Sequence, residues 1–356
     1  MTHQIPVDAP IHGYARTRLM CLNQTYAEVL PDWIQATQLE AGMPCLEHRE
    51  LALPGLEITY VWSAVASVER YTIPDGETHF TLDLDHSAPI LSWAGHDSVR
   101  SARYVIAIHR SQVEYIAVTP PNWSCLYICM NDALLDRLDL LPPKVWQDSQ
   151  DPRNAILEFE MWKLDRFRQF VRQWFTPFAH PHTFSVLSPI EAATLFTEFT
   201  ETLQLLFDRH APQGQAFFFD RPSRRYRNFR DACAWIEAHL ATPLSIEAIA
   251  QELHIAPRSL QYAFQDLAGT SVAKYIQARR LHGVRESLVS GVWPPVGGVG
   301  VKGVELEPIA DDRLAAEASI GQIAKAYGFH HLGRFSQQFF RQFGVLPHEL
   351  RSAIDR

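Results

Sequence analysis

A repeated helix–turn–helix pattern in the C-terminal third constrains the fold of this chain more than any other feature of its sequence. The clearer copy, residues 319–351, reads SIGQIAKAYGFHHLGRFSQQFFRQFGVLPHELR. Ser319 and Gln322 have the spacing of a capping box, which predicts that a helix begins here. Gly328 offers the left-handed conformation that ends a helix. Phenylalanines then recur every fourth residue, at Phe335, Phe339 and Phe343, and predict a second helix with one apolar face.

The same pattern occurs earlier, in residues 245–275, SIEAIAQELHIAPRSLQYAFQDLAGTSVAKY. The matching positions are Leu260, Phe264 and Gly269 in this copy and Phe335, Phe339 and Gly344 in the other. An internal repeat is evidence about architecture that neither copy gives alone. We therefore predict two units in tandem, at about 245–267 and about 319–343. Two short helices, the second with an exposed polar face, form the arrangement that enters a DNA major groove.

The segment from about Arg224 to the C-terminus resembles the DNA-binding domain of the AraC/XylS family of bacterial transcription regulators. The resemblance is carried by RSLQYAFQDLAGTSVAKYIQARRL in the first unit and by IAKAYGFHHLGRFSQQFFRQFGVLPHELR in the second. It implies sequence-specific binding to double-stranded operator or promoter DNA, with two recognition helices in successive major grooves. It also implies an N-terminal domain, often a cupin-like barrel, that holds a small-molecule effector.

Outward-facing side chains on the two second helices are the candidates for DNA contact. By resemblance, Arg258, Gln261 and Tyr262 occupy base-contact positions, with Ser259 beside them on the same outer face. Arg can pair with guanine and Gln with adenine in the major groove. The matching positions in the second unit are His331, Leu332, Arg334 and Gln337. The following cations are expected to meet phosphates, which sets affinity rather than sequence: Lys274, Arg279, Arg280 and Arg285.

Two departures from the family pattern concern the second unit. Gly333 stands where the recognition helix usually has Ser. The second departure is an insertion between the units, residues 291–318, GVWPPVGGVGVKGVELEPIADDRLAAEA. It lacks the order of a phosphate loop and is expected to form a flexible excursion or a hairpin. It leaves the spacing of the units unchanged if its ends lie close together, and otherwise disturbs docking into two grooves.

Charge separates the chain into two parts. The formal net charge is −8 over 356 residues. Residues 224–290 and 319–356 each carry +3, whereas residues 1–223 carry −11. An acidic N-terminal part and a basic C-terminal part are expected of a sensing domain joined to a DNA-binding domain. The chain is long enough for two or three domains with their own cores.

The N-terminal part predicts an α+β protein. From Glu47 to Met130 the sequence has short runs rich in Val, Ile, Tyr, Thr and Trp, separated by turn signals, which suggests a small antiparallel barrel or sandwich. Residues 1–44 are mixed. Four aromatic residues are candidates either for an apolar ligand pocket or for ordinary core: Trp62, Phe80, Trp93 and Tyr115.

Helices are expected after Asp132. Residues 154–175 and a segment opened by Ser188, Pro189 and Glu191 show helical apolar stripes. These helices either pack on the barrel or pair with a second subunit. The expected division is an effector-sensing or dimerisation domain over 1–210, a linker over 211–227 and an all-α DNA-binding domain with two helix–turn–helix units over 228–356.

The sequence offers no catalytic, metal or cofactor site. The N-terminal histidines His79, His86, His96 and His109 lack the clustered spacing of a metal-binding cupin. Cysteines number five, are scattered, and contain no CxxC pair, which favours reduced and mostly buried thiols, with Cys125 and Cys129 on one strand face. No apolar run approaches the about 20 residues of a membrane helix, and no secretory signal begins the chain, so a cytoplasmic location is expected.

The interpretation that best fits these features is a transcription regulator and not an enzyme. Candidate partners are operator DNA, a small-molecule effector, RNA polymerase and a second copy of the chain. Two alternatives stay open. One is a cupin-type enzyme with a helical appendage, and the other is a partner-binding protein whose DNA reading is impaired by the insertion.

Overall fold

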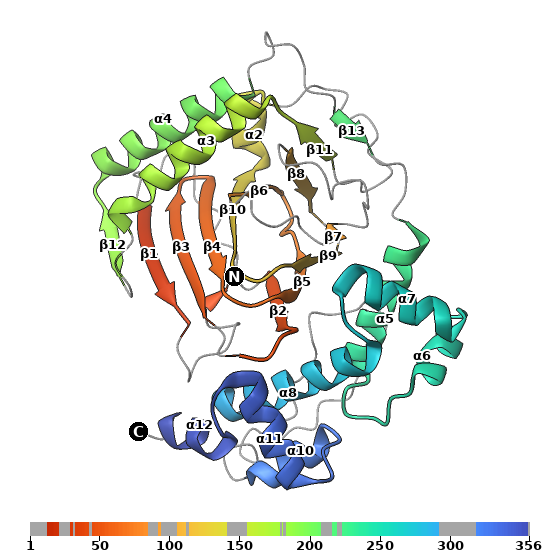
Figure 1. Cartoon of the computed structure of the whole chain (residues 1–356). Helices are drawn as coiled ribbons and strands as arrows, with labels where there is room; N and C mark the ends of the chain where they lie inside the picture. The colour runs from red at the N-terminus through yellow and green to blue at the C-terminus, as the bar shows by residue number, and fades with distance from the viewer. Residues whose placement is uncertain are drawn as a thin grey trace.

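The computed structural model describes residues 13–20, 29–30, 33–42, 45–84, 92–93, 105–111, 114–140, 155–178, 180, 183–207, 216–218, 223–291 and 318–354. The described residues form two β-sheets, a pair of helices over the larger sheet, and a helical C-terminal part (Figure 1). The insertion between the helix–turn–helix units lies outside these residues, apart from Gly291 and Ala318 at its ends.

The larger sheet has nine strands, and every neighbouring pair in it is antiparallel. In spatial order they are β12 (Phe184–Leu187), β1 (Gly13–Leu19), β3 (Leu46–Leu53), β4 (Leu56–Ser63), β10 (Trp123–Asn131), β6 (Glu77–Asp83), β8 (Val105–Arg110), β11 (Ala155–Glu158) and β13 (Ala216–Phe218). The short apolar runs predicted from the sequence are the central strands of this sheet.

The smaller sheet has four antiparallel strands in the order β2 (Ile34–Gln38), β5 (Ser67–Thr72), β9 (Glu114–Thr119) and β7 (Ser92–Trp93). The described strands thus form two open sheets and no closed barrel. The mixed α/β character of the chain is confirmed, whereas a cupin-like barrel is not. We call the two sheets together the N-terminal sandwich.

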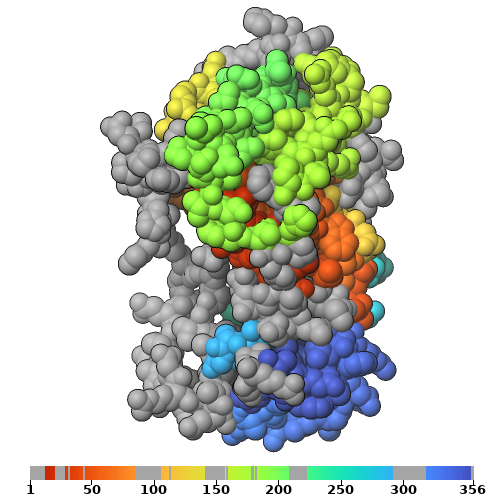
Figure 2. All heavy atoms as spheres, turned by 90° about the vertical axis from the view of Figure 1, so that its left-hand side faces the viewer, coloured from red at the N-terminus to blue at the C-terminus, as the bar shows by residue number. Residues whose placement is uncertain are grey.

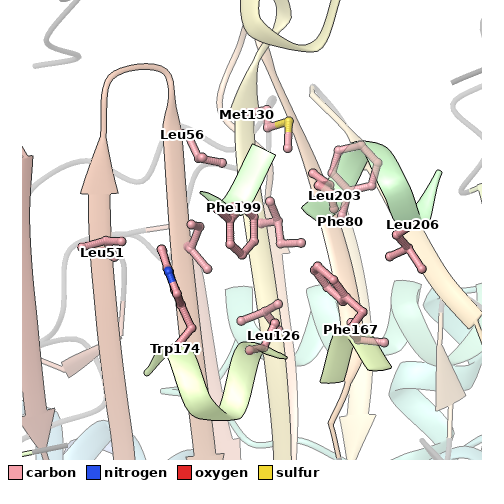
Figure 3. Close-up of a cluster of buried hydrophobic side chains, with 14 of the residues drawn as sticks. Leu51, Leu56, Phe80, Leu126, Met130, Phe167, Trp174, Phe199, Leu203 and Leu206 are labelled. Atoms are coloured by element: carbon pink, nitrogen blue, oxygen red, sulfur yellow. The ribbon is translucent and has the colours of Figure 1, made fainter. Parts of the chain in front are cut away.

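Two helices cover the outer face of the larger sheet. They are α3 (Met161–Trp174) and α4 (Pro189–Leu206), and a shorter helix, α2 (Asp132–Leu138), follows β10. Phe167 and Trp174 from α3 pack with Phe199 from α4 over Phe80 and neighbouring strand residues (Figure 3). In Figure 2 these helices (green) lie over the strands at one end of the molecule, and the last helices (blue) form the opposite end.

A second buried cluster lies between the two sheets. It includes Ile34 and Ala36 from β2, Tyr115 from β9, and Cys125 and Cys129 from β10. The predicted placement of the two cysteines on one strand face is confirmed, and both are buried free thiols. The smaller sheet therefore contributes one face to this interior and leaves its other face for the C-terminal helices.

The C-terminal helices are α5 (Arg224–Ala238), α6 (Ile246–Glu252), α7 (Pro257–Ala268), α8 (Val272–Ser290), α10 (Ile320–Ala326), α11 (Leu332–Phe343) and α12 (Pro347–Ile354). The pairs α6–α7 and α10–α11 lie where the two helix–turn–helix units were predicted. In Figure 1, α8 runs from the first unit to the second and passes beneath β2. None of the helices in the described part of the chain is long and apolar enough to cross a membrane.

One expectation from the sequence needs correction. The helix expected over residues 154–175 begins only at Met161, because residues 155–158 form β11 between β8 and β13. Strand pairing with distant segments overrides the local helical pattern in residues 155–158. The described part of the segment expected as a linker, 211–227, contains β13, at the edge of the larger sheet, and the first turn of α5.

Candidate DNA interface and the sandwich interior

The first unit is built around buried aromatic packing. The Ser245 hydroxyl caps α6 by accepting from the Ala248 amide at 3.0 Å. Pro257 opens α7, where its fixed backbone angle suits the first helical position. On the inner face of α7, Phe264 packs against Phe229 with ring centroids 4.8 Å apart. This packing fixes which face of α7 is left for solvent.

The second unit repeats this construction. The capping box of Ser319 and Gln322 is confirmed, with hydrogen bonds in both directions between side chain and backbone. Gly328 ends the first helix with a φ of +83°, as predicted. The rings of Phe335, Phe339 and Phe343 form a buried row along α11, with successive centroids 5.7 and 4.8 Å apart.

On the first unit, the four residues predicted to face DNA are exposed. They are Arg258, Ser259, Gln261 and Tyr262, all on one face of α7. Arg258 Nε donates to the Tyr262 hydroxyl at 2.8 Å, and the guanidinium lies 5.3 Å from the centre of the Tyr262 ring. The structure thus brings these side chains together as an exposed polar row.

On the second unit, His331, Arg334 and Gln337 are also exposed. His331 is the N-cap residue of α11 and makes no capping hydrogen bond with its side chain. Two apolar residues share the exposed surface of this helix, Leu332 with 40% and Phe340 with 50% of its surface exposed. Phe340 follows Gln337 by three residues and therefore lies on the same face of α11. The sequence pattern had not identified Phe340 as part of this exposed surface.

Arg279 is the predicted DNA-binding residue that the structure contradicts. Its side chain is only 2% exposed, and its guanidinium makes two hydrogen bonds to the Glu237 carboxylate, at 2.6 and 2.7 Å. Arg285, another expected phosphate contact, is equally buried. Arg280 is half-buried and donates to the backbone carbonyls of Leu240 and Thr242. Of the four cations expected on α8, only Lys274 is exposed.

Helix α8 holds the two units together. Leu281, Val284 and Leu288 from α8 belong to the same buried cluster as the three phenylalanines of α11. Gly283 lies against Tyr327, so that a Cβ at this position would overlap the tyrosine ring. The Tyr327 hydroxyl and the Ser287 hydroxyl are hydrogen-bonded at 3.2 Å. The second unit is therefore seated on α8 in spite of the insertion that separates them in sequence.

The first unit is packed on the outer face of the smaller sheet. Val68, Ile116 and Val118 from β5 and β9 belong to the buried cluster of α5, α7 and α8. The Tyr226 hydroxyl accepts from the Ile116 amide at 3.1 Å and donates to the Ile116 carbonyl at 3.2 Å. The smaller sheet therefore separates the sandwich interior from the helices of the first unit by the thickness of one β-sheet.

A cluster of polar groups lies on β1 and β3, where these two strands pair in the larger sheet. Arg16 and Arg18 from β1 converge on the Glu50 carboxylate, at 3.0 and 3.1 Å, and the Tyr14 hydroxyl also donates to it. His48, on the same strand as Glu50, is fully buried, and neither of its ring nitrogens has a hydrogen-bond partner among the described residues. Buried polar groups without partners are uncommon in folded proteins.

Burial shifts the pKa values of three groups on the strands of the two sheets, His48, Glu57 and Glu69. It lowers the pKa of His48 to about 3, with the positive charge of Arg18 acting in the same direction. It raises the pKa of Glu57 to about 7, assisted by the nearby Glu50 carboxylate. It also raises the pKa of Glu69, which accepts hydrogen bonds from Ser67 and Tyr127, to about 7. Desolvation disfavours the charged form in each case.

Of the four aromatic residues considered for a pocket, the three whose side chains are described do not come together. Phe80 packs under the helices, Tyr115 lies between the sheets, Trp62 is half-buried, and the side chain of Trp93 lies outside the described residues. Across the described part of the chain, no group of three or more His, Cys, Asp or Glu side chains is arranged to hold a metal ion.

Comparison with known proteins links the chain to transcription regulators. It is 32% identical over 120 residues to the XylDLEGF operon transcriptional activator of Pseudomonas putida, a match that covers 34% of this chain and 30% of the relative. A second XylDLEGF operon activator from that organism is 31% identical over 124 residues, 35% of this chain and 65% of the relative. The Right origin-binding protein of Escherichia coli K12 is 40% identical over 52 residues, 15% of this chain and 18% of the relative.

Solved structures with local similarity are also transcription regulators. An AraC-type regulator from Chromobacterium violaceum is 25% identical, covers 36% of this chain and 94% of its own, and has a TM-score of 0.28. The AraC-like activator CuxR is 14% identical, covers 75% and 93%, and has a TM-score of 0.36. TM-scores this low do not establish a shared overall fold. No family model matches the chain.

The matched region spans less than a third of the first of these relatives, so the similarity concerns one part of each protein. Its 120 residues are close in length to the helical C-terminal part of this chain. The similarity to the two XylDLEGF operon activators confirms the resemblance to AraC/XylS-type transcriptional regulators that the two helix–turn–helix motifs predicted.

Proposed function

We propose that this protein is a sequence-specific DNA-binding transcription regulator that reads two successive major grooves. The observation that carries the proposal is the pair of exposed polar rows on α7 and α11, both on units that pack against α8. Arg258, Gln261 and Tyr262 on α7 would contact bases with the first unit. Arg334 and Gln337 on α11 would do so with the second, and Ser259 and His331 lie beside these contacts.

The alternative in which the insertion has uncoupled the two units is less well supported. Buried contacts of Tyr327 with Gly283 and Ser287 hold the second unit on α8. The recognition faces are exposed in this arrangement. The proposed domain organisation is an N-terminal regulatory domain over 1–210 and a DNA-binding domain over 228–356. The proposed location of the protein is the cytoplasm.

Regulation is proposed to act through a small molecule held between the two sheets. The polar cluster on β1 and β3 suits a ligand with polar groups. In this cluster, His48 and the Nε atom of Arg16 lack hydrogen-bond partners among the described residues. Thermal unfolding of the wild type and of His48→Phe, each with a library of small acids, alcohols and sugars, tests this assignment. A compound that raises the melting temperature of the wild type alone supports it, and a compound that stabilises both equally contradicts it.

DNA binding is tested by selecting duplexes from a random-sequence library with the full-length protein. The expected result is a sequence with two conserved halves separated by about one helical turn. Binding should weaken steeply with added salt, because phosphate contacts release counterions. Arg334→Ala should relax the sequence preference in one half, and Arg258→Ala in the other. Recovery of no preferred sequence would overturn the proposal.

A further inference from the structure

The edge of β2 is in contact with the C-terminal helices through its backbone. β2 is the outermost strand of the smaller sheet, and Gln38 pairs in register with Ser67 of β5 on its inner side. On the outer side, the Gln38 amide donates to Nε2 of His282, on α8, at 3.1 Å. The side-chain amide of Gln342, on α11, donates to the Gln38 carbonyl at 3.0 Å. Two DNA-binding helices thus occupy the backbone groups that an edge strand leaves unpaired.

The contact between β2 and α11 is reciprocal. The side-chain amide of Gln38 donates to the Gln342 backbone carbonyl at 2.9 Å, and the Gly42 amide donates to the same carbonyl at 3.2 Å. Gln342 Nε2 also reaches the Glu40 carbonyl at 3.2 Å. Gln38 is completely buried and Gln342 is 9% exposed. These bonds are therefore shielded from water, and losing one partner would leave buried groups unsatisfied.

A buried ion pair fixes α8 beside the same strand. Arg279, which holds the Glu237 carboxylate of α5, also donates to the Thr37 hydroxyl of β2 at 3.0 Å. Burial by itself would raise the pKa of Glu237. The positive charges of Arg279 and of Arg70, on β5, outweigh this effect and lower the pKa. Burial lowers the pKa of His282, with the charges of Arg279 and Arg285 acting in the same direction, and this favours the neutral form in which Nε2 can accept from the Gln38 amide. We call this set of contacts the β2 junction: Thr37, Gln38, Glu237, Arg279, His282 and Gln342.

Gln342 lies on α11 away from the face that is open to DNA. Arg334 and Gln337 on that helix are exposed, whereas Gln342 points into the β2 junction. The sandwich therefore does not cover the recognition surface of α11. It contacts the helix from behind, near its C-terminal end, which is the arrangement of a support and not of an occluding lid.

We propose that the edge of β2 positions the second recognition helix for DNA reading, with Gln38 and Gln342 as the positioning residues. This inference rests on the proposed function. Within the described residues, the placement of α11 relative to α7 is held by contacts between segments far apart in sequence. The hydrophobic cluster on α8 is one of these contacts, and the β2 junction is another.

The same strand also contributes to the sandwich interior. Ile34 and Ala36 of β2 are buried between the sheets, while Thr37 and Gln38 contact the helices. A shift of β2 would therefore move the support of α11. This gives the proposed effector space a direct structural connection to the second half of the DNA site, with no intermediate element.

The test uses full-length protein and the duplex selected from the random-sequence library, with versions in which either half is scrambled. The half read by α11 is the one whose preference is relaxed by Arg334→Ala. The variants are Gln38→Ala, Gln342→Ala and the double variant. Gln338→Ala is the matched control, because it removes the same side chain about one turn earlier on α11, where no hydrogen bond to β2 is formed among the described residues.

Gln342→Ala and Gln38→Ala should each bind the complete duplex about tenfold more weakly than the wild type, which is equivalent to about 1.4 kcal/mol. The duplex with the α11 half scrambled should bind the wild type and all variants equally, since it reports only the first unit. The double variant should lose less than the sum of the two single losses, because the two residues act on one contact. Gln338→Ala should bind the complete duplex like the wild type.

Three outcomes would overturn the inference. Unchanged affinity of Gln342→Ala for the complete duplex would show that β2 does not position α11. Tighter binding would show that the contact restrains DNA reading. An equal loss on the scrambled duplex would mean a general effect on folding. Because each of these requires a selected duplex, they contradict the inference while leaving the proposed DNA-binding function intact.

Discussion

The guanidinium of Arg258 is held by Tyr262 one turn further along α7, through a hydrogen bond of 2.8 Å from Nε to the hydroxyl and a contact with the ring. Both side chains are exposed, so this pairing is not a by-product of burial. The hydrogen bond to Tyr262 uses Nε and not the two terminal NH2 groups of the guanidinium. A restrained arginine of this kind loses less rotamer freedom when it binds a base.

We predict that Tyr262→Phe weakens binding to the selected duplex several-fold and changes the preferred sequence less than Arg258→Ala does. The ring contact stays and the hydrogen bond to Arg258 is lost, so the arginine is less well ordered before binding. Arg258→Ala should cost more, about 1–3 kcal/mol, and should relax the preference at one base position. Titration of the duplex by fluorescence anisotropy measures both. Equal losses for the two variants would contradict the orienting role of Tyr262.

Replacing Arg279 should affect folding and not the salt dependence of DNA binding. Arg279→Met removes two hydrogen bonds and the nearest positive charge from the largely buried Glu237 carboxylate, and removing one member of a buried pair costs about 3–5 kcal/mol. Chemical denaturation measures this loss. Glu237→Gln combined with Arg279→Met should recover part of it. If Arg279 contacted a phosphate, Arg279→Met would instead reduce the salt slope of DNA binding by about one. That result would support the role first expected for this residue.

Substitution of Gly283 should separate the second unit from α8. Gly283→Val places side-chain atoms where the Tyr327 ring lies, so that α10 and α11 must shift or α8 must bend. The expected loss of unfolding free energy is about 1–3 kcal/mol. Binding to the α11 half of the duplex should be lost before binding to the α7 half. Ala273→Val, at an exposed position of the same helix, serves as the control and should retain both halves.

Glu69 predicts a dependence of stability on pH. Its folded-state pKa of about 7 lies above the value of 4.5 for an exposed carboxyl, so the folded protein retains a proton that the unfolded chain releases. Its effect on stability is therefore most favourable below pH 4.5 and is lost as the pH rises through 7, by up to about 3 kcal/mol.

Glu69→Gln removes this contribution and should be more stable than the wild type at pH 8 but not at pH 4.5, in urea denaturation curves. The slope should not vanish, because Glu57 titrates in the same window. Glu201→Gln, at an exposed position on α4, is the control for the removal of one carboxyl group. An equal stabilisation by Glu69→Gln at both pH values would contradict the assigned protonation.

The sequence alone determined the two helix–turn–helix units. Capping at Ser319, the turn at Gly328 and the buried row of Phe335, Phe339 and Phe343 all depend on residues within a few turns of one another. Local hydrogen bonds and a 3.6-residue apolar period specify such elements without information from the rest of the chain. The same holds for the exposed positions of Arg258 and Arg334, which follow from the opposite face of each helix.

Only the tertiary structure decided what lies behind those helices. β2 was not predicted, because five residues with a mixed pattern gain their structure from pairing with β5. Arg279 was expected on the surface, since an arginine in a helix is most often exposed, yet Glu237 and Thr37 surround it from two other elements. Contacts between segments far apart in sequence leave no periodic signal in either one. The faces that read DNA are therefore evident from the local sequence, whereas the support that holds them is a property of the fold.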